Sequence, residues 1–234
     1  MHQQRFFIVL LVFFASYNTS FSQDGYTVVT RDLEAWYSAG IKYKPGKKLS
    51  IDFEQGWRLN QNASATDQIL TDFGIKWKPI KPVYFGLGLR YIKDRGGNDL
   101  FDNDFRFNLD AGVKHKVDRF TFNYRLRFQN RNEIGLSTAE GDYFKNYFRL
   151  KLAAAYNIKN WKLDPKISTE VFRDMTRYTG GFNNFRVTIG TDYSLKQFGK
   201  ISAFYRMERD LGSTYPKTTN IIGLGYTFTI NTKK

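Results

Sequence analysis

Cationic side chains alternate with apolar ones in the stretch RFTFNYRLRFQNR, Arg119 to Arg131, where Arg125 and Arg127 stand two residues apart. Guanidinium groups bind carboxylates, phosphates and other oxyanions through several hydrogen bonds at once. Arginines that repeat on one side of an alternating segment therefore predict a set of internal ion pairs or a surface that attracts anions.

The alternation also predicts the elements that carry these charges, because successive side chains of a β-strand point to opposite faces. Apolar and polar residues alternate through most of the chain. Strands are predicted at Leu33–Lys44, Leu49–Asn60, Gln68–Lys78, Val83–Arg95, Asp104–Lys116, Arg119–Arg131, Tyr143–Asn157, Trp161–Phe172, Phe185–Leu195, Lys200–Asp210 and Thr218–Ile230. Short turns such as PGKK and PIKP separate some strands, and longer polar loops separate the others.

These lengths are typical of a single, all-β, antiparallel transmembrane barrel. A strand of about ten residues is long enough to cross a bilayer at a tilt. Short turns and longer loops alternate, as they do between the periplasmic and external ends of outer-membrane barrels. Bacterial barrels normally have an even number of strands, so we expect twelve, with GYTVVT (Gly25–Thr30) as the additional strand. Ten strands, with one segment misassigned, is the alternative.

Charged residues that share the parity opposite to the aromatic residues are predicted to line the lumen. They are Arg58, Arg90, Arg106, Arg125, Arg127, Arg149, Lys151, Arg186, Arg206, Glu54, Asp110 and Glu170. An Arg or Lys that faced lipid at the midplane would cost about 2–4 kcal/mol, so their segregation to one parity favours a barrel.

Two interpretations of this lumen remain open. In the first, the charges pair in ladders that fill the interior, and the protein is a structural or interaction barrel that acts through its external loops. In the second, the basic excess around Arg125, Arg127 and Arg149 lines a small, porin-like, anion-preferring pore.

The N-terminus has the features of a secretory signal peptide. Arg5 precedes ten apolar residues, Phe6–Ala15, and small residues follow at Ser20 and Ser22. Ten apolar residues are too few to span a bilayer as a helix. We expect cleavage after Ser22, so that residues 1–22 are the signal peptide and residues 23–234 are a barrel in the outer membrane of a Gram-negative bacterium.

The formal net charge of +14 predicts anionic partners. Export from the cytoplasm argues against nucleic acid. The expected partners are outer-membrane lipid, the phosphates of lipopolysaccharide, small anionic solutes and, during insertion, the barrel-assembly machinery. The chain has no cysteine, and a barrel closed by its own hydrogen bonds needs no disulfide.

Catalytic chemistry has few candidate residues. After the signal peptide the chain has one histidine, His115, in GVKHKVD. An outer-membrane lipid hydrolase or acyltransferase would need a histidine base beside a nucleophile near the outer leaflet, whereas His115 falls at a predicted periplasmic strand end. The segment GLGLR, Gly86–Arg90, belongs to a strand and not to a phosphate-binding loop. We therefore expect no enzyme activity, cofactor or metal, and a lipid enzyme is the least favoured alternative.

Aromatic residues near the predicted periplasmic turns are candidates for an interfacial girdle. Trp77, Tyr84, Tyr156 and Trp161 flank these turns, where such girdles lie in outer-membrane barrels.

Four segments carry a resemblance to a known family: LSIDFEQGWRLNQ, FTFNYRLRFQNRNE, KNYFRLKLAAAYNI and WKLDPKISTEVF. They resemble the outer-membrane barrels of the domain-of-unknown-function 2490 family, which are widespread in Bacteroidota. The resemblance covers nearly the whole chain after residue 22 and implies location and fold, but no activity.

The last predicted strand carries a second resemblance. IIGLGYTF is similar to the C-terminal signal that the barrel-assembly machinery reads, with Gly223, Tyr226 and Phe228 at its glycine and aromatic positions. It departs from that signal at Ile221, where a polar residue is usual, and in the six residues that follow Phe228.

Overall fold

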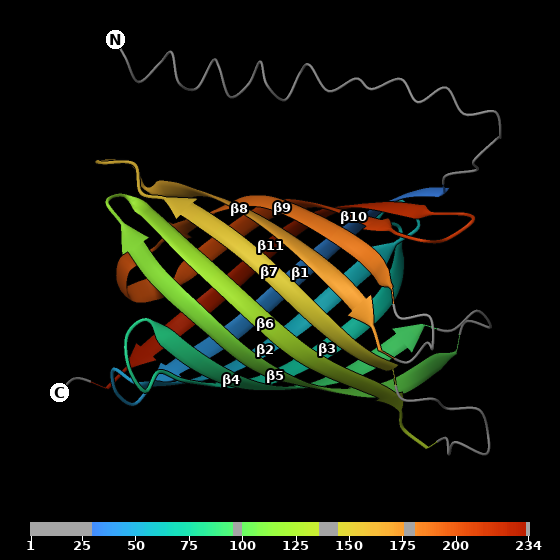
Figure 1. Cartoon of the computed structure of the whole chain (residues 1–234), viewed down its shortest axis with the longest axis horizontal. Helices are drawn as coiled ribbons and strands as arrows, with labels where there is room; N and C mark the ends of the chain where they lie inside the picture. Colours follow the sequence, from blue (N-terminus) through green and yellow to red (C-terminus); the bar gives the residue numbers. More distant parts are fainter. Residues whose placement is uncertain (1–29, 96–99, 136–144, 176–180, 233–234) are drawn as a thin grey trace, which may run out of the picture.

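The computed structural model describes residues 30–95, 100–135, 145–175 and 181–232. These residues form a closed β-barrel of eleven strands with one short 3₁₀ turn, η2, at Lys196–Phe198 (Figure 1). The strands are β1 (Thr30–Lys44), β2 (Leu49–Asn60), β3 (Ala65–Trp77), β4 (Val83–Arg95), β5 (Phe101–Val117), β6 (Phe120–Glu133), β7 (Lys145–Tyr156), β8 (Leu163–Asp174), β9 (Phe182–Ser194), β10 (Lys200–Asp210) and β11 (Lys217–Asn231). The all-β closed barrel and the eleven predicted strands are confirmed, although residues 143–144 of the strand predicted at Tyr143–Asn157 lie outside the described residues.

The expected number of strands was wrong. The described residues form eleven strands, neither twelve nor ten, and β1 pairs directly with β11. With an odd number of strands the first and the last run in the same direction, so this closing pair is parallel while the other neighbours are antiparallel. The pairing extends from Thr30–Lys217 to Lys44–Asn231 and leaves no free edge for another strand. Of the candidate twelfth strand, residues 25–29 lie outside the described residues, and Thr30 already belongs to β1.

The lengths of the strands differ from the prediction in both directions. Six strands are longer than predicted (β1, β3, β5, β6, β9 and β11), four have the predicted length (β2, β4, β8 and β10), and β7 is shorter within the described residues. At one end of the barrel, here called the short-turn end, the connections are residues 45–48, 78–82, 118–119, 157–162 and 195–199. At the opposite end, here called the loop end, they are residues 61–64, 96–100, 134–144, 175–181 and 211–216. The connection between the strands predicted at Leu49–Asn60 and Gln68–Lys78 is shorter than expected, because β2 and β3 stay paired through Asn60 and Ala65, across a register shift beside Arg58.

The two faces of the wall differ as the alternation predicts. Leu126 and Leu150 face each other on β6 and β7, point outward and are 50% and 47% exposed, whereas Arg149, which precedes Leu150 on β7, points inward and is 6% exposed. Apolar residues thus cover the outside and charged residues fill the inside. Among the described residues, no helix has the length and apolar character needed to cross a membrane.

The closing pair can be tested by crosslinking, since the natural chain has no cysteine. Ala39 faces Tyr226 on β11 and Gln55 on β2, and all three side chains lie on the outer face. Ala39→Cys combined with Tyr226→Cys is expected to crosslink with a thiol reagent that spans one strand spacing, about 4.8 Å. Denaturing electrophoresis of the treated protein detects the crosslink, because the closed loop changes the migration of the unfolded chain.

Two further pairs serve as controls for this experiment. Ala39→Cys with Gln55→Cys joins neighbouring strands and should also crosslink. Gln55→Cys with Tyr226→Cys lies two spacings apart and should not. Failure of the Ala39–Tyr226 pair beside a successful Ala39–Gln55 pair would mean that another strand separates β1 from β11.

Candidate functional site

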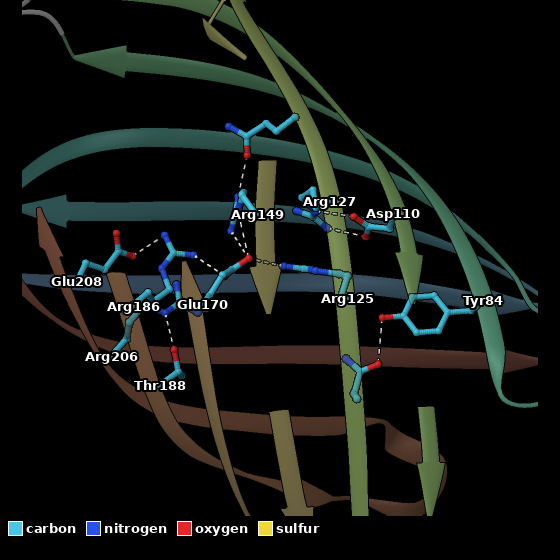
Figure 2. A network of polar contacts seen from close by, with 12 residues as sticks. Tyr84, Asp110, Arg125, Arg127, Arg149, Glu170, Arg186, Thr188, Arg206 and Glu208 are labelled. Carbon is cyan, nitrogen blue, oxygen red and sulfur yellow. Dashed lines mark hydrogen bonds and ion pairs between the residues drawn. The ribbon is translucent and has the colours of Figure 1, made fainter. Parts of the chain in front are cut away.

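The middle of the barrel interior holds one carboxylate surrounded by three arginines (Figure 2). Glu170 on β8 accepts from Arg125 on β6 at 2.7 Å and from Arg149 on β7 at 3.0 Å, and lies 3.4 Å from Arg186 on β9. Glu170 is 3% exposed. Inward side chains of four consecutive strands therefore converge on a single buried anion, here called the Glu170 cluster.

Aromatic rings fill the space beside this cluster. The guanidinium carbons of Arg149 and Arg186 lie 4.3 and 4.8 Å from the ring centroid of Phe172. Arg58 and Arg206 lie in the same way over Trp36, at 3.6 and 4.8 Å. Stacked guanidinium and aromatic groups exclude water while the charge stays stabilised by the ring, so β1 and β8–β11 enclose a packed half of the interior.

Phe204 completes this packed half. Its ring meets Trp36 edge-on, with centroids 6.5 Å apart, and lies across Gly223 on the neighbouring strand, where an added Cβ would overlap it. The glycine expected in the C-terminal assembly signal therefore has a packing role in the folded barrel, because only hydrogen fits beneath the ring.

Toward the loop end, ion pairs and buried apolar side chains point into the interior. Arg131 contacts the carboxylates of Asp94 and Asp104. Leu70 and Ile92 face each other on β3 and β4, and both are buried.

The other half of the interior contains a cavity of about 340 Å³. Three of its wall positions are Gly74, Gly86 and Gly88, on β3 and β4, which place no side chain in the space. Toward the short-turn end Tyr84 lies across Gly112, and its hydroxyl donates to Asn123 at 3.0 Å. The cavity exists because glycines stand where the opposite wall carries arginines and aromatic rings.

The structure divides the twelve predicted lumen residues between these two halves. Glu54, Arg90, Arg106, Asp110, Arg125, Arg127 and Lys151 line the cavity. Arg149, Glu170 and Arg186 form the Glu170 cluster with Arg125, and Arg58 and Arg206 flank Trp36. All twelve point inward, but they form two different environments.

Several cavity cations are neutralised locally. Arg127 makes two hydrogen bonds to Asp110, at 2.6 and 2.8 Å, in the bidentate geometry favoured by guanidinium and carboxylate. Arg90 donates to Asp72 at 2.5 Å. These pairs join neighbouring strands directly across the ladder.

The short-turn end carries a high density of lysines, here called the lysine-rich mouth. Its members in the terminal parts of the strands and in the turns are Lys42, Lys44, Lys47, Lys48, Lys76, Lys78, Lys81, Lys114, Lys116, Lys159, Lys162, Lys166 and Lys200. Asp52 and Asp192 neutralise only part of this charge, through pairs with Lys42 and with Lys166 and Lys200. A concentration of one sign of charge at the opening of a cavity attracts ions of the opposite sign.

Tyr84, predicted as an interfacial aromatic residue, lies inside the barrel. Tyr84 is 5% exposed and points into the barrel, because it has the same strand parity as Arg90. Trp77 and Trp161 lie exposed at the short-turn end, and Tyr156 packs against Phe120 with ring centroids 4.8 Å apart.

The inward aromatic residues Trp36, Phe172 and Phe204 were not among the predicted site residues, although each shares the parity of charged residues on its own strand. Sorting the aromatic residues by parity would have identified them.

Other predicted residues lie outside the cavity. His115 is stacked between Phe122 and Tyr124, at centroid distances of 5.5 and 5.7 Å, on the outer face near the short-turn end. Tyr226 and Phe228 point outward from β11. Their recognition by the assembly machinery stays a prediction.

The packing of Tyr84 against Gly112 gives a stability prediction. Gly112→Ala places a methyl group where the ring lies and is expected to lower the free energy of unfolding by about 1–3 kcal/mol. Urea unfolding in lipid vesicles measures this change. In a Tyr84→Ala background the same substitution should cost much less, while Gly46→Ala, which meets open space, serves as the control. Equal costs in both backgrounds would show that the ring does not lie over Gly112.

A family model described as protein of unknown function (DUF2490) matches residues 33–231, which is nearly all of the described barrel. No curated protein and no solved structure matches the chain. The match begins within β1 and ends with β11, so it covers both strands that close the barrel. The chain therefore belongs to the DUF2490 family of proteins of unknown function.

Proposed function

We propose that this protein is an outer-membrane β-barrel whose interior is closed to the free passage of ions, and which acts as a structural or interaction barrel. Burial of the Glu170 cluster carries the proposal. Arg149 and Glu170 lie midway along their strands and are 6% and 3% exposed. In a water-filled pore such side chains would be hydrated.

The outer face supports placement in a membrane. Leu109, Leu126 and Ile189 point outward near the middle of their strands and are about half exposed. Apolar surface of this extent is unfavourable in water and is what a lipid-facing wall requires. The signal peptide expected at residues 1–22 supports export, but those residues lie outside the described part of the chain.

A barrel with this interior needs no separate plug domain to block its lumen. The arginine and aromatic side chains that fill the β1 and β8–β11 half come from the wall itself. Ion pairs and buried apolar residues occupy the loop end. Removal of these side chains is therefore what would open a path.

The second candidate is an anion-preferring pore, which the unpaired cations of the cavity favour. The pore requires a continuous path for ions past the Glu170 cluster, and the closed barrel has no such path. The proposal assigns no catalytic activity to the barrel.

Bilayer recordings distinguish the two candidates. The refolded wild-type protein is expected to give no steady conductance in a planar bilayer. A variant that combines Arg149→Ala with Glu170→Ala removes both halves of a central ion pair and should give discrete conductance steps. Leu150→Ala, which shortens the adjacent outward side chain, should remain silent. Steady, anion-selective conductance of the wild type would contradict closure and establish the pore.

Surface labelling tests the membrane orientation. Ser213 lies at the loop end and Lys47 at the short-turn end, and both are exposed. If the loop end faces outward, an epitope tag inserted at Ser213 should bind antibody on intact cells. The same tag at Lys47 should bind only after the outer membrane is permeabilised. The reverse pattern would mean the opposite orientation. If neither tag were detected in the membrane fraction, that result would argue against insertion.

A further inference from the structure

The cavity contains cations that the protein itself does not neutralise. Arg90, Arg125 and Arg127 each contact a carboxylate. Arg106 and Lys151 also line the cavity, but within the described part of the barrel neither forms an ion pair.

Arg106 occupies an unfavourable position for a residue with only a structural role. It stands directly opposite Arg90 on β4 and Arg131 on β6. The carboxylates nearby already bind those two arginines: Asp72 pairs with Arg90, and Asp104 pairs with Arg131. Like charges placed directly opposite each other destabilise a sheet. The position of Arg106 therefore calls for an additional negative charge.

Unsatisfied polar atoms lie in the same place. Among the described residues, the buried Nε of Arg106 and the buried Oδ1 of Asn108 have no hydrogen-bond partner. Asn108 is 5% exposed and lines the cavity beside Arg106 on the same face of β5. Buried polar groups without partners are costly and call for an ion or ordered water.

Lys151 on β7 also has no ion-pair partner among the described residues. In the strand register it stands between Arg125 and Glu170. Glu170 is already shared by Arg125, Arg149 and Arg186, so it offers Lys151 no separate counterion.

We propose that the cavity binds a small hydrophilic anion whose phosphate or carboxylate group is held by Arg106, while Lys151, six residues away in the strand register, adds positive charge elsewhere in the cavity. The volume of about 340 Å³ falls near the lower end of ligand pockets, roughly 300–1,000 Å³. The glycine wall leaves room for the body of the ligand. Glu54 and Asp72 also line the cavity and can accept hydrogen bonds from hydroxyl groups, which favours a hydroxylated compound with one anionic group, such as a sugar phosphate or sugar acid.

The lysine-rich mouth gives such an anion an approach from the short-turn end. Lys76 connects the mouth to the cavity, since it belongs to both. Binding needs access from this end only, so it is compatible with closure at the Glu170 cluster and goes beyond the proposed closed barrel.

Ligand-dependent stability of the purified barrel tests the proposal. Glucose 6-phosphate, added to the full chain in uncharged detergent at constant ionic strength, should raise the urea midpoint of unfolding in proportion to the logarithm of its concentration. Glucose should have no effect. Arg106→Gln should weaken the apparent affinity about tenfold or more, because it removes a charge-assisted contact, whereas Lys151→Gln should weaken it by less, because it removes only a more distant positive charge. Arg209→Gln, at an exposed cation outside the cavity, should leave it unchanged.

The ligand-free variants separate binding from a structural role. Arg106→Gln removes the repulsion with Arg90 and Arg131, so it should raise the midpoint of the ligand-free barrel while it weakens binding. If the ligand-free midpoint of Arg106→Gln is lower than that of the wild type, and the wild type does not respond to glucose 6-phosphate, then Arg106 only supports the fold. Equal stabilisation of wild type and Arg106→Gln would place the anion elsewhere and also overturn the proposal. Because the assay uses detergent, its failure is independent of membrane orientation and of conductance.

Discussion

The buried carboxylate of Glu170 is the group on which the interior arrangement depends. Three arginines from three other strands converge on it. A buried charge is tolerated only when it is paired and hydrogen-bonded, and here one anion serves several cations. The cations are further stabilised by aromatic rings, since Arg149 and Arg186 both lie over Phe172. The cluster thus turns charged side chains into a packed interior.

The two halves of the interior follow from which side chains the strands direct inward. On the side of β1 and β8–β11, Trp36, Phe172 and Phe204 occupy the volume. On β3 and β4 the corresponding inward positions include Gly74, Gly86 and Gly88, and a cavity remains. Among the described residues, Arg106 and Lys151 line the cavity without an ion-pair partner, and Lys76 belongs both to the cavity and to the lysine-rich mouth. The packed half and the cavity are therefore two results of one uneven distribution of large and small residues.

The positions of the strands and the direction of most side chains could be predicted from sequence, because both depend on the two-residue period of a strand. The predicted lumen residues, from Glu54 to Arg206, are far apart in sequence, but each points inward according to the alternation of side chains along its own strand. A closed barrel was expected, but the pair of strands that closes it could not be predicted in the same way, since the pairing of β1 with β11 joins the first and last strands of the chain and has no local signal. An even strand count was expected from a general tendency of bacterial barrels, and the direct β1–β11 ladder overrides it.

The candidate site shows the same division between local and long-range information. Parity identified the cavity arginines, and applied consistently it would have directed Tyr84 inward as well. The cavity itself was not predictable, because its existence depends on which side chains from distant strands meet across the lumen. The convergence of Arg125, Arg149 and Arg186 on Glu170 also requires the register of four strands. No single segment contains that information.

A double-mutant cycle between Arg149 and Glu170 tests most directly whether this cluster organises the interior. The free energy of unfolding is measured in lipid vesicles for wild type, Arg149→Gln, Glu170→Gln and the double variant. Glu170→Gln alone leaves Arg125 and Arg149 without their carboxylate, while Arg186 keeps Glu208, and should cost on the order of 3–5 kcal/mol. The double variant should cost less than the sum of the single variants, with a coupling on the order of 0.5–3 kcal/mol. Additive effects would show that the two side chains do not depend on each other, and would contradict a barrel interior built around Glu170.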